Sequence, residues 1–416
     1  MIYIRKSKFY PPYTVLLILY CFFIVVAFLL ASPKEIFQGL KQIILSPDIL
    51  ISDYVEIGGI GASLLNAALT SILSIFLLIF IGVKPNGATI MSLWLMTGFS
   101  FFGKNIINIW PIIIGVFIYS KYQKEPFLNY SLVALLSTTL APTVSQLSFT
   151  NYFSITTAII LGYIIGISTG FILAPIASHC IKAHNGYNLY NIGFAGGLFA
   201  TLLMSIFRAS GIEFETRALW NANSNYPFAI ILFIVSIYLI IIGLINNPSK
   251  KENFLSLLNQ PGRLVSDYYI LFGTTCYINM GILCLFSTLL VLVLKSHLNG
   301  PTIAGIFTIV GFGAFGKHIK NITPIIIGAI LGAIFNVNPL NSPSLILSIL
   351  FSTALAPIAG KYGVLVGILA GFLHVNMVTN VGYLHGGLNL YNNGLAAGFV
   401  AMLLIPVINV FKKENL

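Results

Sequence analysis

Charged side chains are scarce in this chain of 416 residues. Only 7% of the residues are Asp, Glu, Lys or Arg and 57% are hydrophobic, whereas a soluble domain carries about 25% charged residues. This balance excludes an ordinary water-soluble domain. Apolar runs such as Thr14 to Leu30 and Ala229 to Ile245 approach the length of about 20 helical residues that crosses roughly 30 Å of hydrocarbon. The sequence therefore predicts a helical, multi-pass membrane protein.

Cysteines and catalytic motifs are also few. The four cysteines have no CxxC spacing, which argues against a disulfide framework and against a zinc site. The chain has no P-loop, GxSxG or HExxH motif, so nucleotide hydrolysis and the common hydrolytic mechanisms are not expected. We predict no cofactor, no metal and no enzymatic activity. A membrane-embedded enzyme that uses His184 and His385 is the remaining enzymatic alternative, but duplication of the whole set suits a pathway between two halves better.

Acidic residues are the rarest charged class, with 10 Asp and Glu against 21 Lys and Arg. The basic residues are scattered in the connections between apolar runs, a pattern typical of loops that face anionic lipid, and nothing in it suggests nucleic acid. All acids except Glu56 lie outside the apolar runs or at their ends. Asp53 and Asp267 are the repeated acids, and we expect them to cap a helix or to pair with a loop base; a proton relay is the alternative.

An internal repeat is evident in the sequence. Residues Gly98 to Gly115 read GFSFFGKNIINIWPIIIG and residues Gly311 to Gly328 read GFGAFGKHIKNITPIIIG, with 13 of 18 positions identical. A glycine ladder follows in each copy, with a spacing that lets helices approach closely in lipid. It consists of Gly162, Gly166 and Gly170 in the first copy and of Gly363, Gly367 and Gly371 in the second. We predict repeat one over residues 1–212, a linker over 213–224 and repeat two over 225–416.

Each repeat contains about five apolar runs and one interrupted segment. In repeat one the runs cover about 13–32, 56–82, 127–146, 153–180 and 189–210. The interrupted segments, near 88–119 and 301–332, have arms of about 15 residues, too short to span, which favours a re-entrant hairpin. A pair of full helices is the alternative. The fold class is thus an all-α integral membrane protein with two inverted repeats, each of about five transmembrane helices plus one hairpin.

Charge supports the inverted arrangement. A basic N-terminus in the cytoplasm places the balanced connection 33–52 outside and its equivalent 247–266, which is richer in lysine and arginine, inside. Lys412 and Lys413 also fall inside. We therefore expect a protein of the cell membrane with both termini in the cytoplasm.

Each hairpin carries a lysine at its tip, Lys104 or Lys317. A charge at bilayer depth is expensive and is kept mainly for function. The second arm begins just after the lysine, so its positive helix end faces the same point, with Asn108 or Asn321 on its first turn. Such a site favours an anion or the carbonyl oxygen of a neutral solute. Alternatively, each lysine lies at the membrane surface and extends to the head groups.

A second set of polar residues follows the glycine ladder in each repeat. Asparagine, tyrosine and histidine supply the donors and acceptors that a polar solute needs once it has shed its water. The alternative is a loop and a helix cap. The candidate solute-lining residues are His184, Asn188, Tyr190 and Asn191, with their equivalents His385, Asn389, Tyr391 and Asn392.

The repeated GFxxFGKxIxN and HxGxNLYNxG segments resemble an uncharacterised family of duplicated bacterial multi-pass membrane proteins, over nearly the whole chain. More loosely, the plan is similar to that of urea transporters, whose family conducts a small neutral solute between two repeats. Asn108 and Pro111 are three residues apart rather than adjacent, and Lys104 has no counterpart in a urea slot, so this likeness is one of architecture.

These observations predict a transporter or channel for a small polar or anionic solute, which passes through a central site between the repeats. The competing hypothesis is a membrane scaffold or sensor that binds a lipid or protein partner between its halves. Membrane lipid is an expected partner in either case, and a homo-oligomer is possible in principle.

Overall fold

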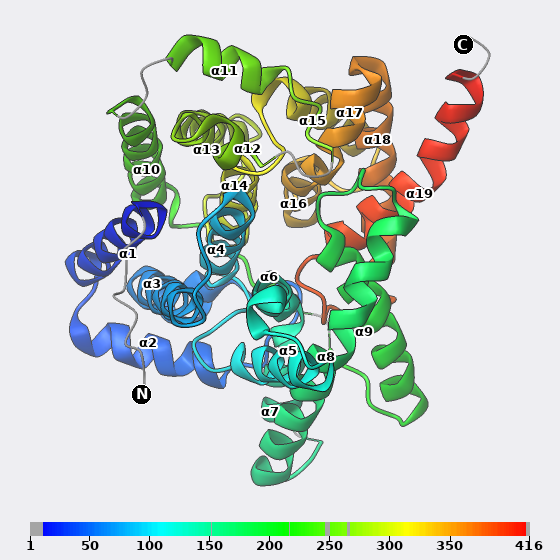
Figure 1. Ribbon diagram of the computed structural model, residues 1–416. Helices are drawn as coiled ribbons and strands as arrows, with labels where there is room; N and C mark the ends of the chain where they lie inside the picture. Colours follow the sequence, from blue (N-terminus) through cyan, green and yellow to red (C-terminus); the bar gives the residue numbers. More distant parts are fainter. Residues whose placement is uncertain (1–10, 151, 216, 246–249, 264–266, 413–416) are drawn as a thin grey trace.

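The computed structural model describes residues 11–150, 152–215, 217–245, 250–263 and 267–412, and the described chain is helical. Figure 1 shows the first half of the chain, coloured blue through cyan to green, mainly in the lower part of the view and the second half, coloured green through yellow to red, mainly in the upper part. The elements of the first half are α1 (Pro11–Leu30), α2 (Pro33–Leu45), α3 (Tyr54–Phe80), α4 (Gly87–Phe99), α5 (Trp110–Tyr122), η1 (Phe127–Tyr130), α6 (Ser131–Ser137), η2 (Thr138–Leu140), α7 (Ala141–Phe149), α8 (Ile155–Ala183) and α9 (Asn191–Ala209).

The second half has a matching order of elements. They are α10 (Asn225–Ile245), α11 (Lys250–Leu258), α12 (Tyr268–Phe272), α13 (Thr275–Val293), α14 (Gly300–Phe312), α15 (Ile319–Ile334), α16 (Pro343–Ser352), η3 (Thr353–Leu355), α17 (Ala356–Tyr362), α18 (Val364–Val381) and α19 (Asn392–Lys412). The third span of each half is interrupted by a short 3-10 turn, at η2 and at η3, just before a proline.

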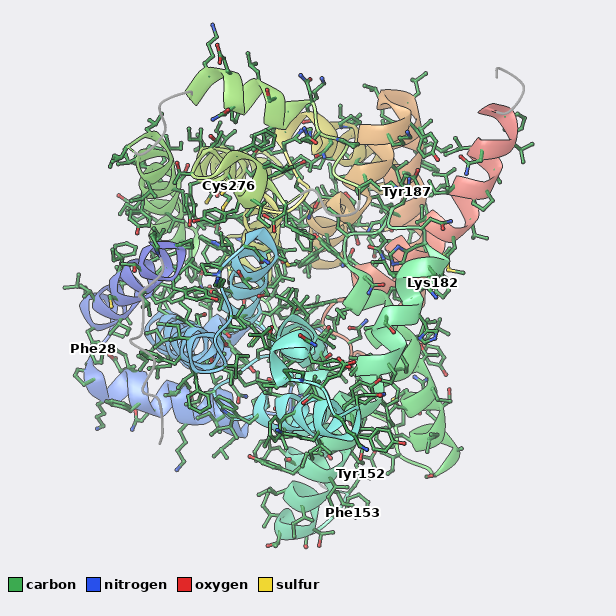
Figure 2. The ribbon with its side chains drawn as sticks, viewed as in Figure 1. Phe28, Tyr152, Phe153, Lys182, Tyr187 and Cys276 are labelled. Carbon is green, nitrogen blue, oxygen red and sulfur yellow. The ribbon has the colours of Figure 1, made fainter. Side chains whose placement is uncertain are left out.

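Ten helical segments of the described chain are long and apolar enough to cross a membrane. Many large apolar side chains point outward: Phe28, Tyr152 and Phe153 lie at the edge of the molecule in Figure 2, and each is more than 40% exposed. Such a surface is stable in contact with lipid rather than water. The chain is therefore a multi-pass membrane protein, as its composition predicts.

The connections after the first span of each half fold into helices that the sequence analysis did not identify. α2 begins with a capping box, in which Ser32 accepts from the Glu35 amide and Glu35 accepts from the Ser32 amide. α11 occupies the corresponding place in the second half, and both helices lie along the outer edge in Figure 1.

The two interrupted segments consist of short helices separated by a glycine turn. α4 and α14 have 13 residues each, which corresponds to about 20 Å at 1.5 Å per residue. Gly103 has a φ of 88° and Gly316 a φ of 108°, a left-handed conformation that glycine adopts without a steric penalty. A glycine turn therefore precedes each lysine directly.

α4 and α14 pack against each other in antiparallel orientation at the centre of the molecule (Figure 1). The start of α4 lies at the end of α14, where Asp267 Oδ1 accepts from the Gly87 amide at 2.9 Å. The start of α14 lies at the end of α4, where Asp53 Oδ1 accepts from the Gly300 amide at 3.2 Å. α4 and α14 thus run in opposite directions, and an aspartate from each half caps the start of the other half's helix.

The glycine ladder packs against the second arm of each interrupted segment, as its spacing predicts. A Cβ added to Gly170 would collide with the backbone of Ile112 in α5, and one added to Gly371 would collide with the backbone of Ile325 in α15. Helix axes can come this close only where one side chain is absent.

The basic N-terminal residues and Lys413, on which the predicted orientation depends, lie outside the described residues. The orientation of the termini stays a prediction.

Candidate functional site

Lys104 and Lys317 are completely buried, and each is held by a tyrosine from the other half of the chain. Lys104 Nζ donates to Tyr391 Oη at 2.7 Å, and Lys317 Nζ donates to Tyr190 Oη at 2.5 Å. Each ammonium also lies over the ring of its tyrosine, 4.8 Å and 4.5 Å from the centroids. The lysines and the tyrosines belong to two separate motifs of the sequence, and the structure brings them together. The surface alternative does not fit side chains with no exposed area.

Each ammonium makes one further hydrogen-bond contact, and no carboxylate of the described residues lies within ion-pair distance of either. Lys317 Nζ donates to Thr353 Oγ1 at 2.8 Å. Lys104 has a weaker contact, with Met96 Sδ at 3.7 Å. A lysine has three N–H donors, so neither site provides the negative charge or the full set of strong acceptors that a buried ammonium needs.

Two asparagines that the sequence analysis missed hold the lysine turns. Asn66 Nδ2 donates to the Lys104 carbonyl at 2.9 Å, and Asn279 Nδ2 donates to the Lys317 carbonyl at 2.7 Å. Both asparagines are buried within a span. Their signal in the sequence is an amide side chain inside an apolar run of each repeat, at the same distance along the chain before the lysine.

Asn188 and Asn389 each bind a backbone carbonyl of the other half. Asn188 Nδ2 donates to the Gly394 carbonyl at 2.9 Å, and Asn389 Nδ2 donates to the Gly193 carbonyl at 3.0 Å. The two glycines lie in contact where α9 and α19 cross, since a Cβ on Gly394 would lie 2.8 Å from the Gly193 Cα. These residues fix the centre at which the halves meet.

The histidines pair with asparagines of their own segment. Nε2 of His184 lies 3.0 Å from Asn191 Oδ1, and Nε2 of His385 lies 2.7 Å from Asn392 Oδ1. Burial lowers the pKa of both imidazoles, which favours their neutral form at pH 7. The structure therefore shows these four residues as two hydrogen-bonded pairs, and neither histidine lines the central cavity.

Asn108 and Asn321 close the hairpin turns. Their amides donate to the carbonyls of Gly103 at 3.1 Å and Gly316 at 2.9 Å. Asn321 lies on the first turn of α15, as predicted. The same prediction for Asn108 is wrong: α5 begins at Trp110, because Asn108 takes part in a separate turn before it.

The two halves differ at one buried carboxyl group. Asp48 Oδ2 accepts from Tyr54 Oη at 2.9 Å and from Asn108 Nδ2 at 3.1 Å. The equivalent position in the second half is Gly262, where a Cβ would lie 2.8 Å from Asn321 Nδ2. Burial raises the pKa of Asp48 to about 7, although these hydrogen bonds act in the opposite direction.

A cavity of about 340 Å³ lies between the halves, beside the lysine–tyrosine pairs. Tyr190 and Tyr391 line it, together with Phe99 and Phe312, whose rings also lie under the lysine ammonium groups. The lysines do not line the cavity themselves, because these aromatic side chains lie between each ammonium and the cavity. Most of the remaining lining residues are apolar; the polar ones are Asn188, Asn191, Thr308 and Asn393.

The fold and this centre define a multi-pass membrane protein whose two halves share one buried polar site. The chain belongs to the family described as "Protein of unknown function (DUF1576)", whose model matches residues 32–209 and 246–410. This confirms the resemblance to an uncharacterised, duplicated family. None of the curated proteins and none of the solved structures matches the chain, so the likeness in plan to urea transporters gains no support.

Proposed function

We propose that this protein is a transporter or channel of the cell membrane that moves a small anionic or polar solute through the centre shared by its two halves. The observation that carries the proposal is the reciprocal arrangement of the buried lysines. Each lysine comes from one half, is held by a tyrosine of the other half, and lies behind the wall of one cavity. Motion of one half against the other would change both pairs together.

Charge favours an anion over a neutral solute. Burying an ammonium without a negative partner costs several kcal/mol, and intramembrane charges of this kind mark substrate pathways. Neither Lys104 nor Lys317 has a carboxylate partner among the described residues. An anionic solute would supply the missing negative charge, so its binding would be more favourable than that of a neutral analogue.

The architecture of the proposal is a pair of inverted repeats, each with one re-entrant hairpin. The antiparallel packing of α4 against α14 supports the inversion. Helices of about 20 Å that end a few residues before a buried lysine support re-entry, because a span needs about 30 Å. Interrupted helices beside a central site are a common plan of transporters.

The second candidate is a scaffold or sensor that binds a lipid or protein between its halves. One observation favours it: the side chains of Asn188 and Asn389 form hydrogen bonds between the halves. In this role the polar residues would serve packing, and the lysines would carry no solute-dependent function.

Thermal stabilisation of the purified protein tests the proposal. A ligand that binds the folded state raises the apparent melting temperature by mass action. We expect at least one small anion from a panel of inorganic anions, carboxylates and matched amides to stabilise the wild type. The effect should be lost in Lys104→Met and Lys317→Met. Lys320→Met is the matched control, because Lys320 is an exposed lysine on α15, three residues after Lys317.

Stabilisation that persists unchanged in both hairpin variants would remove the lysines from the site. A folded wild type that no anion stabilises would favour the scaffold.

A further inference from the structure

The wall of the central cavity is too apolar for a solute that is polar on all sides. Its lining includes Met91, Leu95, Leu136, Phe351 and Leu390, besides the aromatic rings beside the lysines. A transported solute must exchange its hydration for contacts with such a wall, and unpaired polar groups would be costly there. The apolar part of the wall must therefore face an apolar part of the solute.

The polar groups on the wall are largely engaged within the protein. Asn188 binds the Gly394 carbonyl, Asn191 binds His184 and the Ala177 carbonyl, and Thr308 donates to the Ala304 carbonyl. Asn393 lies 2.9 Å from His374 Nε2. These groups have little hydrogen-bonding capacity left with which to replace the water around a sugar, a polyol or a small inorganic ion.

Positive charge lies directly behind two tyrosines of the wall. Tyr190 and Tyr391 line the cavity, and their hydroxyl oxygens accept from Lys317 and Lys104. An ammonium that donates to a phenol oxygen polarises the phenol O–H, which becomes a better donor to an anion. The two tyrosines, each with an ammonium group against its ring, are thus the part of the wall that most favours a negatively charged group.

From this arrangement we infer that the solute is an amphipathic organic anion, with one carboxylate on a short aliphatic or aromatic body. The carboxylate binds at the tyrosine–lysine pairs, and the body packs against the apolar wall. The inference rests on the proposed function and names its substrate class. A cavity of about 340 Å³ lies at the low end of the roughly 300–1,000 Å³ of small-molecule pockets, which suits such a body and not the two acyl chains of a membrane lipid.

A homologous series of ligands tests this class. The probes are acetate, butyrate, hexanoate and benzoate, with hexanamide and benzamide as matched neutral compounds, and the dissociation constants come from thermal shifts of the full-length purified protein. Burial of each methylene should improve affinity about fourfold, so hexanoate should bind far more tightly than acetate. Hexanoate should bind at least tenfold more tightly than hexanamide, and benzoate at least tenfold more tightly than benzamide.

Two kinds of variant separate the two parts of the inference. Lys104→Met and Lys317→Met should abolish the preference for carboxylate over amide and keep the dependence on chain length. Leu132→Asn, at a half-buried position of the cavity wall where a polar side chain can be tolerated, should weaken the dependence on chain length and keep the preference for carboxylate.

The outcomes distinguish this class from transport in general. Acetate that binds as tightly as hexanoate and benzoate would overturn the apolar part while leaving transport of a small anion standing. Amides that bind as tightly as carboxylates would overturn the anionic part. A folded wild type that binds none of the probes, yet is stabilised by an inorganic anion, would overturn the class alone; no stabilisation by any compound would overturn the proposed function as well.

Discussion

At the scale of single residues, the site consists of groups whose partners come from the other half of the chain. The sequence identified Lys104 and Lys317, because a lysine within a repeated apolar segment is unusual. It also identified Tyr190 and Tyr391, but in a different group. That the lysine of one half binds the tyrosine of the other could not be predicted, because it depends on how the two halves pack.

The polar residues that sequence reasoning assigned to the solute path divide into different roles. Asn188 and Asn389 bind backbone carbonyls across the interface, and the histidines bind asparagines. A repeated asparagine serves equally well as a ligand group or as a structural hydrogen-bonding group, and its composition alone cannot separate the two roles. The distances show which groups each asparagine already contacts in the structure.

Asp48 gives a prediction at this scale. Its folded-state pKa, about 7, lies above the ordinary value for Asp of about 3.9. Between these values the unfolded chain has lost the proton and the folded chain keeps it, so stability decreases as pH rises through this window. We expect the apparent melting temperature to fall from pH 5 to pH 8, and Asp48→Asn to reduce that fall.

The control for Asp48 is Glu125→Gln, which changes an exposed carboxyl group and should leave the pH profile as it is in the wild type. An Asp48→Asn protein whose melting temperature falls as steeply as that of the wild type would show that another group causes the effect.

At the scale of helices, the sequence predicted the spans well and the short elements poorly. All five runs of the first half correspond to spans within a few residues, because continuous hydrophobicity is a strong signal. The helices α2 and α11 were missed. Both are short and more polar than the spans, so neither has a long apolar run, and the signal of α2 is local capping chemistry.

Gly371 gives a prediction for the packing of helices. A Cβ at this position would collide with the backbone of Ile325, so α15 and α18 would have to move apart. We expect Gly371→Ala to destabilise the protein by about 1–3 kcal/mol, measured as a lower apparent melting temperature. In Gly382→Ala, by contrast, the added Cβ meets no atom within 4 Å, and the variant should melt like the wild type. Equal melting of all three proteins would contradict the close approach of these helices.

At the scale of the whole molecule, the two halves form one unit rather than two independent domains. The predicted boundaries, 1–212 and 225–416, follow the repeat, but the lysine sites, the caps of α4 and α14 and the crossing of α9 with α19 each require both halves. The duplication was visible in the sequence because the motifs are nearly identical. The exchange of contacts was not, since identical motifs pack in many ways.

Inverted topology makes a prediction about the two sides of the membrane. Lys84 and Lys295 are exposed residues in the connections that precede α4 and α14. In a Cys21→Ser background, a cysteine at position 84 and a cysteine at position 295 should react with a membrane-impermeant maleimide from opposite sides. Cys21 is replaced because it is exposed, whereas the other three cysteines are buried. Labelling of both positions from the same side would exclude the inverted arrangement.

Transport in proteoliposomes tests the central claim most directly: that the buried lysines serve the passage of an anion. Radiolabelled anions of the panel would be supplied at pH 8, where carboxylates are ionised and cross the lipid slowly. At least one should enter faster than into protein-free liposomes. Loss of a charged hydrogen-bond partner costs about 1.5–3 kcal/mol, so Lys104→Met and Lys317→Met should each lower the rate at least tenfold, and Lys320→Met should not. Equal uptake by wild type and both hairpin variants, or no uptake of any anion above the protein-free control, would contradict the account.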